Sequence, residues 1–144
     1  SVVELSYRLL PAMIEAGHGG IINVSSLAGF QPVPYAAIYS ASKSFLTTFS
    51  MALREEVRPS GVKVVTVCPG RLQADLEDET GKEKRSKVPG GEQSHEEVVS
   101  ETLKKLDRGG GLVIPGRMNR WTVRGQRLIA LNAVPKIVAR LSRP

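Results

Sequence analysis

The fold of this chain is decided by residues 39–57, YSASKSFLTTFSMALREEV, and by residues 62–68, VKVVTVC. The first stretch contains no Gly or Pro, and Phe45, Phe49 and Leu53 recur at four-residue steps, which predicts a long helix. The second stretch is a run of β-branched residues that predicts a buried strand. The short connection RPSG between them is typical of a helix that returns directly to a sheet.

The same alternation extends to both sides of this pair. Residues 1–16 carry apolar side chains three and four residues apart and end at glycines, which predicts a helix. Residues 21–24 and 112–114 predict two further short strands, and the capping-box spacing SHEE at residues 94–97 predicts a helix through residue 106. Helices and strands that alternate in this way predict an α/β fold with a doubly wound parallel sheet.

Composition excludes several classes of protein. The chain has 144 residues, enough for one hydrophobic core, with 41% hydrophobic and 24% charged residues. Its single cysteine, Cys68, excludes an internal disulfide, and with only two histidines a zinc site is disfavoured, so we expect no metal. We expect neither a membrane span nor a secretory signal, and therefore a cytoplasmic protein, because no apolar run approaches about 20 residues and no basic-then-apolar segment opens the sequence.

The net charge of +6 comes from the end of the chain. Residues 108–144 contain eight Arg or Lys and no Asp or Glu. We therefore divide the chain at residue 116, into a main body over 1–116 and a basic amphipathic tail over 117–144 that is helical with a break before Pro135. The mixture of arginines and aliphatic residues fits peripheral contact with an anionic membrane, or else a terminal helix whose apolar face covers the sheet or a partner subunit. Nucleic acid is disfavoured, because the tail holds one aromatic residue.

Tyr39 and Lys43 lie four residues apart on the predicted helix and so share one face, with their Cβ atoms about 5–6 Å apart. The positive charge of the ammonium favours the phenolate, which makes the phenol usable as an acid or base. Alone, the pair is one that chance places on many helices. Ser25-Ser26 and Pro69-Gly70, however, leave the carboxyl ends of two predicted strands, which is where open parallel sheets bind ligands.

Three motifs occur in order: Asn23-Val-Ser-Ser26, Tyr39-Ser-Ala-Ser-Lys43 and Val67-Cys-Pro-Gly70, with Ser26 placed 13 residues before Tyr39. With this order and spacing the chain resembles the carboxyl-terminal part of a short-chain dehydrogenase/reductase, a Rossmann-type family that uses NAD or NADP. The resemblance implies that residues 1–116 are the carboxyl-terminal part of a Rossmann-type dehydrogenase domain. The resemblance implies an oxidoreductase that interconverts an alcohol and a carbonyl on a small molecule. It also implies a homo-oligomer at full length.

The resemblance implies a role for each matching residue. Tyr39 is the general acid/base that exchanges a proton with the substrate oxygen, and Lys43 supports the phenol and hydrogen-bonds the nicotinamide ribose. Ser26 holds the substrate oxygen. Pro69, Gly70 and Leu72 match the segment that lies against the nicotinamide.

The family's glycine-rich turn, which cradles the pyrophosphate, does not occur in residues 1–144. We therefore expect an incomplete sheet without the first strands of the family, and a truncated form with little activity alone. The alternative is a non-catalytic truncated module that binds a partner or an anionic membrane through its basic tail.

The remaining polar residues carry separate predictions. The family spacing favours Ser26 over Ser25, so we expect Ser25 to bond the backbone and Cys68 to be a small core residue. Tyr35 either lines the substrate pocket or packs. Residues 75–92, rich in charge and glycine, predict a solvated loop in the position of a ligand-covering segment.

Overall fold

The computed structural model describes residues 1–72, 93–126 and 133–141. In chain order, its elements are α1 (Val2–Ala16), β1 (Gly19–Val24), the 3-10 turn η1 (Leu27–Phe30), α2 (Ala37–Val57), the 3-10 turn η2 (Arg58–Ser60), β2 (Val62–Val67), α3 (His95–Asp107), β3 (Gly111–Val113), α4 (Arg117–Gln126) and α5 (Val134–Leu141). The predicted loop at residues 75–92 and part of the predicted tail, residues 127–132 and 142–144, lie outside the described residues.

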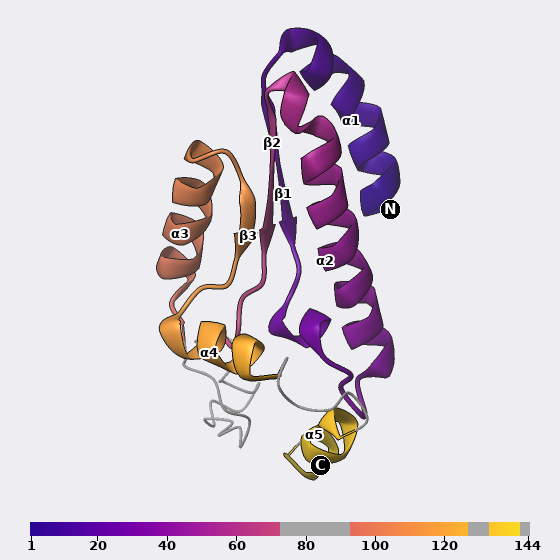
Figure 1. The fold of residues 1–144 in the computed structure, drawn as a ribbon, viewed down its shortest axis with the longest axis vertical. Helices are drawn as coiled ribbons and strands as arrows, with labels where there is room; N and C mark the ends of the chain where they lie inside the picture. The colour runs from indigo at the N-terminus through magenta and orange to yellow at the C-terminus, as the bar shows by residue number, and fades with distance from the viewer. Residues whose placement is uncertain (73–92, 127–132, 142–144) are drawn as a thin grey trace, which may run out of the picture.

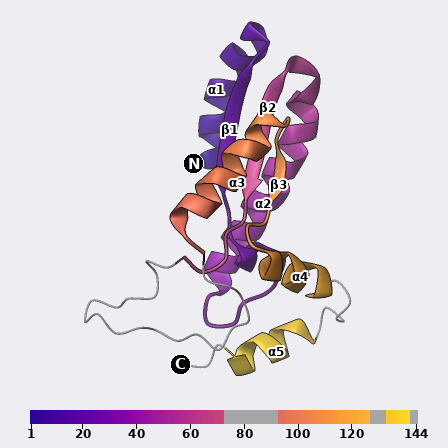
Figure 2. The ribbon, with the colours of Figure 1, turned by 90° about the vertical axis from the view of Figure 1, so that its left-hand side faces the viewer.

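The three described strands form one parallel sheet in the order β1-β2-β3. Gly19 of β1 pairs with Val62 of β2, and Val65 of β2 pairs with Gly111 of β3. Helices α1 and α2 cover one face of the sheet and α3 covers the other (Figure 1, Figure 2). The doubly wound parallel sheet predicted from the sequence is therefore confirmed.

The core has two halves because β2 is buried on both of its faces. On the side of α1 and α2, Val62 and Val64 pack with Leu10, Leu53 and Val57. On the side of α3, Val65 and Val67 pack with Val113, Val98 and Leu106. Side chains of a strand alternate between faces, so an uninterrupted valine-rich run supplies both halves of the core.

Local signals set the ends of the helices. The Ser94 hydroxyl accepts a hydrogen bond of 3.1 Å from the Glu97 amide, which caps α3 as the capping-box spacing predicted. Gly17 ends α1 with φ of +71°, a left-handed conformation that favours glycine. Helix α2 begins at Ala37, two residues before the predicted start, because the Ser40 amide already bonds the Ala36 carbonyl at 2.9 Å.

The basic tail contains two described helices, α4 and α5. Pro135 is the second residue of α5, where its missing N–H costs no helical hydrogen bond. Buried valines of both helices, Val123, Val134 and Val138, face the protein. Both helices lie at the end of the molecule toward which the strands point (Figure 1, Figure 2). Among the described helices none is both long and apolar enough to cross a bilayer.

Candidate active site

The connections that leave β1 and β2 run beside each other at the carboxyl end of the sheet. The Ser25 amide donates to the Val67 carbonyl at 2.8 Å, and the Leu27 amide donates to the Pro69 carbonyl at 3.1 Å. These bonds continue the pairing of the two strands beyond their ends. The serine segment and the Pro69-Gly70 segment are therefore held together, at the edge where parallel sheets bind ligands.

Helix α2 brings Tyr39 and Lys43 to the same edge. The Lys43 ammonium donates to the Val24 carbonyl, at the last residue of β1, over 3.0 Å. It also lies 5.7 Å from the centre of the Tyr39 ring, within the range of a cation–π contact. Tyr39 is 49% exposed, so its phenol is open to a reactant. The structure thus places an ammonium beside a phenol at the carboxyl end of the sheet.

Ser26 turns the chain out of β1. Its half-buried side chain caps η1, with the hydroxyl oxygen accepting a hydrogen bond of 3.2 Å from the Ala28 amide. Because the oxygen is the acceptor in that bond, the O–H group of Ser26 keeps its capacity to donate.

Ser25 has a different environment from Ser26. It is 3% exposed, and its hydroxyl donates to the Lys43 carbonyl at 2.9 Å and pairs with the Thr47 hydroxyl at 2.7 Å. Asn23 makes a similar link to Ser50 on α2 over 2.8 Å. These buried bonds fasten the chain around the serines to α2, and they confirm the prediction that Ser25 bonds the backbone.

Thr47 is a residue that sequence reasoning missed. It is 5% exposed and touches both Ser25 and Cys68, with 3.8 Å between the Thr47 oxygen and the Cys68 sulfur. The sequence signal for it is its place one helical turn after Lys43, on the face that turns toward β1. Gly29 of η1 packs so closely on this face that a Cβ there would lie 2.9 Å from the Thr47 hydroxyl oxygen.

Cys68 is fully buried, as predicted for a core residue. Burial is the main cause that raises the pKa of its thiol, against hydrogen bonds from Thr47 and Ser25 and the Lys43 charge, which act in the opposite direction. A thiol held in its neutral form is a poor nucleophile. Cys68 therefore acts as packing beneath the site.

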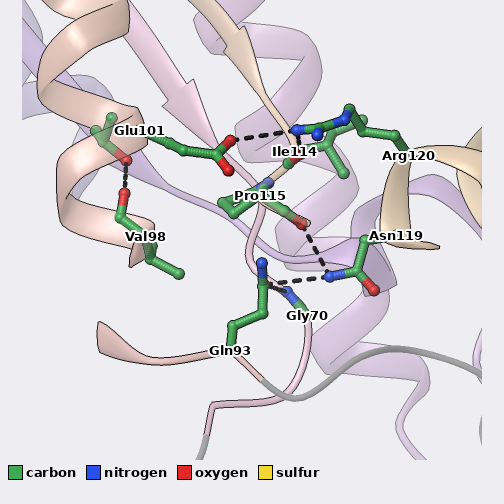
Figure 3. Close-up of polar contacts among 9 residues, drawn as sticks. Gly70, Gln93, Val98, Glu101, Ile114, Pro115, Asn119 and Arg120 are labelled. Carbon is green, nitrogen blue, oxygen red and sulfur yellow. Dashed lines mark hydrogen bonds and ion pairs between the residues drawn. The ribbon is translucent and has the colours of Figure 1, made fainter. Parts of the chain in front are cut away.

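The segment after β2 is held by Gln93. The Gly70 amide donates to the Gln93 side-chain oxygen at 3.1 Å, and the Gln93 amide donates to the Arg71 carbonyl at 3.2 Å. Leu72 pairs with Gln93 in an isolated parallel bridge. Gln93 and its neighbour Asn119, shown in Figure 3, also carried no sequence prediction.

Other residues weighed from the sequence have exposed side chains. Tyr35 is 67% exposed with φ of +67°, so it does not pack. His18 and His95 are exposed. Within residues 1–72, 93–126 and 133–141, no three His, Cys, Asp or Glu side chains gather in a group that could hold a metal ion.

A cavity of about 550 Å³ lies between η1, the following loop and the start of α2. Its α2 wall is formed by Ala37, Ser40, Ala41 and Ser44, which follow one another at helical spacing. That spacing puts them on a different face of α2 from Tyr39 and Lys43. The cavity is therefore separate from the face that carries the phenol and the ammonium.

Residues 1–85 match the sequence profile of the short chain dehydrogenase family. The chain belongs to this family. The match includes Ser26, Tyr39, Lys43 and Gly70, which the structure gathers at the carboxyl end of the sheet.

Curated relatives agree with this assignment. A ketoacyl reductase, HetN, from Nostoc is 44% identical over 70 residues, which are 49% of this chain and 24% of that protein. The human very-long-chain 3-oxoacyl-CoA reductase is 46% identical over 69 residues, 48% of this chain and 22% of that protein. The matched part thus spans about a quarter of each curated relative.

Solved structures match over more of the chain. A short-chain dehydrogenase from Burkholderia cenocepacia in complex with NADP has a TM-score of 0.70 at 27% identity, over 99% of this chain and 55% of that one. One from Sphingobium yanoikuyae in complex with NADPH has a TM-score of 0.66 at 28% identity, over 88% and 50%. The chain therefore spans about half the length of these structures, and it shares their Rossmann fold.

Proposed function

We propose that the complete gene product containing this chain is an NAD(P)-dependent oxidoreductase that interconverts an alcohol and a carbonyl on a small molecule. The observation that supports this most directly is the position of Lys43, whose ammonium bonds the end of β1 and lies over the Tyr39 ring. The alignments to the ketoacyl reductases, which cover about half of this chain, support the same reaction class.

The described residues fit one end of a nicotinamide dinucleotide. The Lys43 ammonium has three N–H donors. One donates to the Val24 carbonyl, which leaves two that can donate to ribose hydroxyls. Pro69, Gly70 and Leu72 supply a backbone segment at the same edge of the sheet. The G-x-G-x-x-G sequence motif of the pyrophosphate turn does not occur in residues 1–144, so these contacts account for the nicotinamide end alone. When bound, the dinucleotide supplies or accepts the hydride.

The side chains of this chain handle the proton. In the reducing direction the Tyr39 hydroxyl gives its proton to the substrate oxygen, and in the oxidising direction the phenolate takes it back. The Ser26 O–H donates a hydrogen bond to the same oxygen and stabilises charge that develops there. Lys43 stabilises negative charge on the phenol oxygen and holds the ribose. The 144-residue chain alone is expected to turn over little, since the pyrophosphate lacks its cradle.

Tyr39→Phe in the complete gene product tests this function. The change deletes the proton donor and keeps the ring beneath the Lys43 ammonium, so turnover with NADH or NADPH should fall by about 100-fold or more while dinucleotide affinity stays near that of the unchanged protein. Tyr7→Phe is the matched control, because that phenol is 71% exposed on α1, a helix that contributes no residue to the site. Near-normal turnover in Tyr39→Phe would remove the mechanism.

A second candidate function rests on the outer side of α4. Met118 and Trp121 are 60% and 67% exposed and lie between the exposed Arg117 and Arg124. An exposed tryptophan among arginines suits the interface of an anionic membrane. Salt-sensitive flotation with anionic vesicles, lost in Trp121→Ala, is expected if α4 meets a membrane. Absence of flotation at low salt would leave the packing role that Val123 already performs.

The proposed homo-oligomer is supported by exposed apolar side chains on the two helices of one face. Leu5, Tyr7 and Leu9 of α1 and Ile38 and Phe45 of α2 are all between 45% and 88% exposed. Clusters of this kind mark association surfaces on soluble proteins. Sedimentation of the complete gene product should show an assembly, and Leu5→Lys should weaken it.

A further inference from the structure

Two buried amide side chains meet behind the segment that follows β2. Gln93 is 3% exposed and Asn119 is 1% exposed. The Gln93 side-chain oxygen accepts two hydrogen bonds of 3.1 Å, one from the Gly70 amide and one from the Asn119 side-chain nitrogen. The same nitrogen donates to the Pro115 carbonyl at 3.0 Å. Figure 3 shows the two amides pointing toward one another and toward Gly70.

The amide pair fits against backbone that has no side chain in the way. A Cβ on Gly70 would lie 2.6 Å from the Asn119 side-chain nitrogen, and a Cβ on Gly116 would lie 2.8 Å from the Gln93 side-chain nitrogen. Both distances are shorter than any unstrained contact, so each glycine leaves the space that an amide fills. The pair is thus matched in shape to the ends of both β2 and β3.

Stability alone does not account for this cluster. The Asn119 side-chain oxygen is buried and has no hydrogen-bond partner among the described residues. A buried polar atom without a partner opposes folding, and an apolar pair of similar shape would avoid that cost. The polar pair does what an apolar pair cannot, because it fixes the direction of a particular backbone N–H.

That N–H belongs to the segment assigned to the nicotinamide. Gln93 binds the segment at two points. Its side-chain oxygen accepts from the Gly70 backbone N–H, and its backbone N–H donates to the Arg71 carbonyl at 3.2 Å. The peptide group between Gly70 and Arg71 is therefore bracketed by one residue, and Leu72 continues beside Gln93 in a bridge. The Asn119 side-chain nitrogen in turn donates to the Gln93 side-chain oxygen, and this bond holds the Gln93 side chain in the orientation that accepts from Gly70.

We propose that Gln93 and Asn119 are positioning residues that hold the backbone of residues 70–72 against the nicotinamide. The inference rests on the proposed function, since it assigns that backbone to a dinucleotide. Helix α4 then contributes to the site, because Asn119 of this helix contacts Gln93, which in turn binds the Gly70 amide.

Three variants of the complete gene product separate positioning from stability. Gln93→Met removes the acceptor for Gly70 and keeps the length of the side chain. Asn119→Leu keeps that acceptor and removes its support. Arg120→Met, the control, removes the bonds from the next residue of α4 to Glu101 at 3.2 Å and to the Ile114 carbonyl at 3.1 Å, without touching Gly70.

The first measurements are dinucleotide affinity and the melting temperature. Gln93→Met should weaken binding of NADH or NADPH by about tenfold, the effect of roughly one well-placed hydrogen bond, and Asn119→Leu by about threefold. Arg120→Met should lower the melting temperature and change affinity by less than about twofold. Affinities in Gln93→Met and Asn119→Leu equal to that of the unchanged protein would overturn the positioning role.

The second measurement does not depend on any ligand. Hydrogen exchange of the Gly70 amide should be slow in the unchanged protein, faster in Gln93→Met, and unchanged in Arg120→Met. Unaltered Gly70 exchange in Gln93→Met overturns the proposed clamp whatever the affinities are. If the unchanged protein binds neither NADH nor NADPH, the proposed function fails and the role toward the nicotinamide fails with it, whereas the exchange of Gly70 still decides whether Gln93 holds this backbone.

Discussion

Ser25 and Ser26 are neighbours whose replacement by alanine should have opposite effects. Ser25 is 3% exposed and makes two hydrogen bonds to α2, at 2.9 Å to the Lys43 carbonyl and at 2.7 Å to the Thr47 hydroxyl. Ser26 is half-buried, and its oxygen accepts one longer bond of 3.2 Å. We therefore expect Ser25→Ala to affect stability and Ser26→Ala to affect turnover.

The size of each effect follows from what the change leaves behind. Among the residues that the structure describes, Ser25→Ala leaves the buried Thr47 hydroxyl with the Cys68 sulfur, 3.8 Å away, as its remaining side-chain partner. An unsatisfied buried group costs about 1–3 kcal/mol in the free energy of unfolding. Ser26→Ala removes a cap from a short 3-10 turn, for which we expect less than about 1 kcal/mol. Loss of a donor to the reacting oxygen, however, lowers kcat by about 100- to 1,000-fold.

Urea denaturation and steady-state kinetics on the complete gene product measure the two effects separately. With a slope of about 1–3 kcal/mol per molar urea, Ser25→Ala should move the denaturation midpoint down by roughly 1 M. Ser26→Ala should move the midpoint by less than Ser25→Ala does and should lose turnover. The reasoning is refuted if Ser26→Ala is the less stable variant, or if Ser25→Ala alone loses turnover at an unchanged midpoint.

Three further outcomes are expected. Lys43→Met should weaken dinucleotide binding and lower turnover together, unlike Tyr39→Phe, because Lys43 serves both the ribose and the phenol; binding titrations and kinetics check this, and an unchanged affinity would contradict it. Gly29→Ala should lower the free energy of unfolding by about 1–3 kcal/mol in thermal denaturation, because its Cβ would lie 2.9 Å from the Lys43 carbonyl oxygen. Gly109→Ala is the comparison: its Cβ would meet no atom of the described residues within 4 Å, so any loss of stability there comes from the backbone φ of +94°. Burial raises the pKa of the Cys68 thiol in the folded chain, so the unfolded chain loses this proton first as pH rises. The free energy of unfolding should therefore hold below the ordinary thiol pKa of about 8.5 and decline above it. Denaturation at several pH values should show a weaker decline in Cys68→Ala.

The sequence predicts the layered fold well because the signals involved are local. The valine run of β2 predicts a strand buried on both faces, and the structure buries Val64 and Val65 on opposite faces of the sheet. The Ser94 cap is equally local. The motif residues Ser26, Tyr39 and Lys43 are also readable, because their spacing is a property of the chain itself.

The supports of the site could not be predicted in this way. Gln93 lies 23 residues from Gly70 and 26 from Asn119 along the chain, and nothing near any of the three in sequence marks it as a partner of the others. Asn119 lies within a stretch that composition describes only as basic and amphipathic. Buried polar contacts of this kind depend on how elements pack, and packing is decided after the local pattern has been satisfied.

The bond from the Leu27 amide to the Pro69 carbonyl joins the turn that carries Ser26 to the turn assigned to the dinucleotide. The two turns cannot be displaced independently without losing it. A mutation that reshapes the serine turn for a bulkier substrate therefore also shifts the cofactor side of the reaction, and changes of substrate preference are more easily made elsewhere. Residues 31–36, which connect η1 to α2, lie outside this linkage, so a change in that connection leaves the bond between the two turns in place.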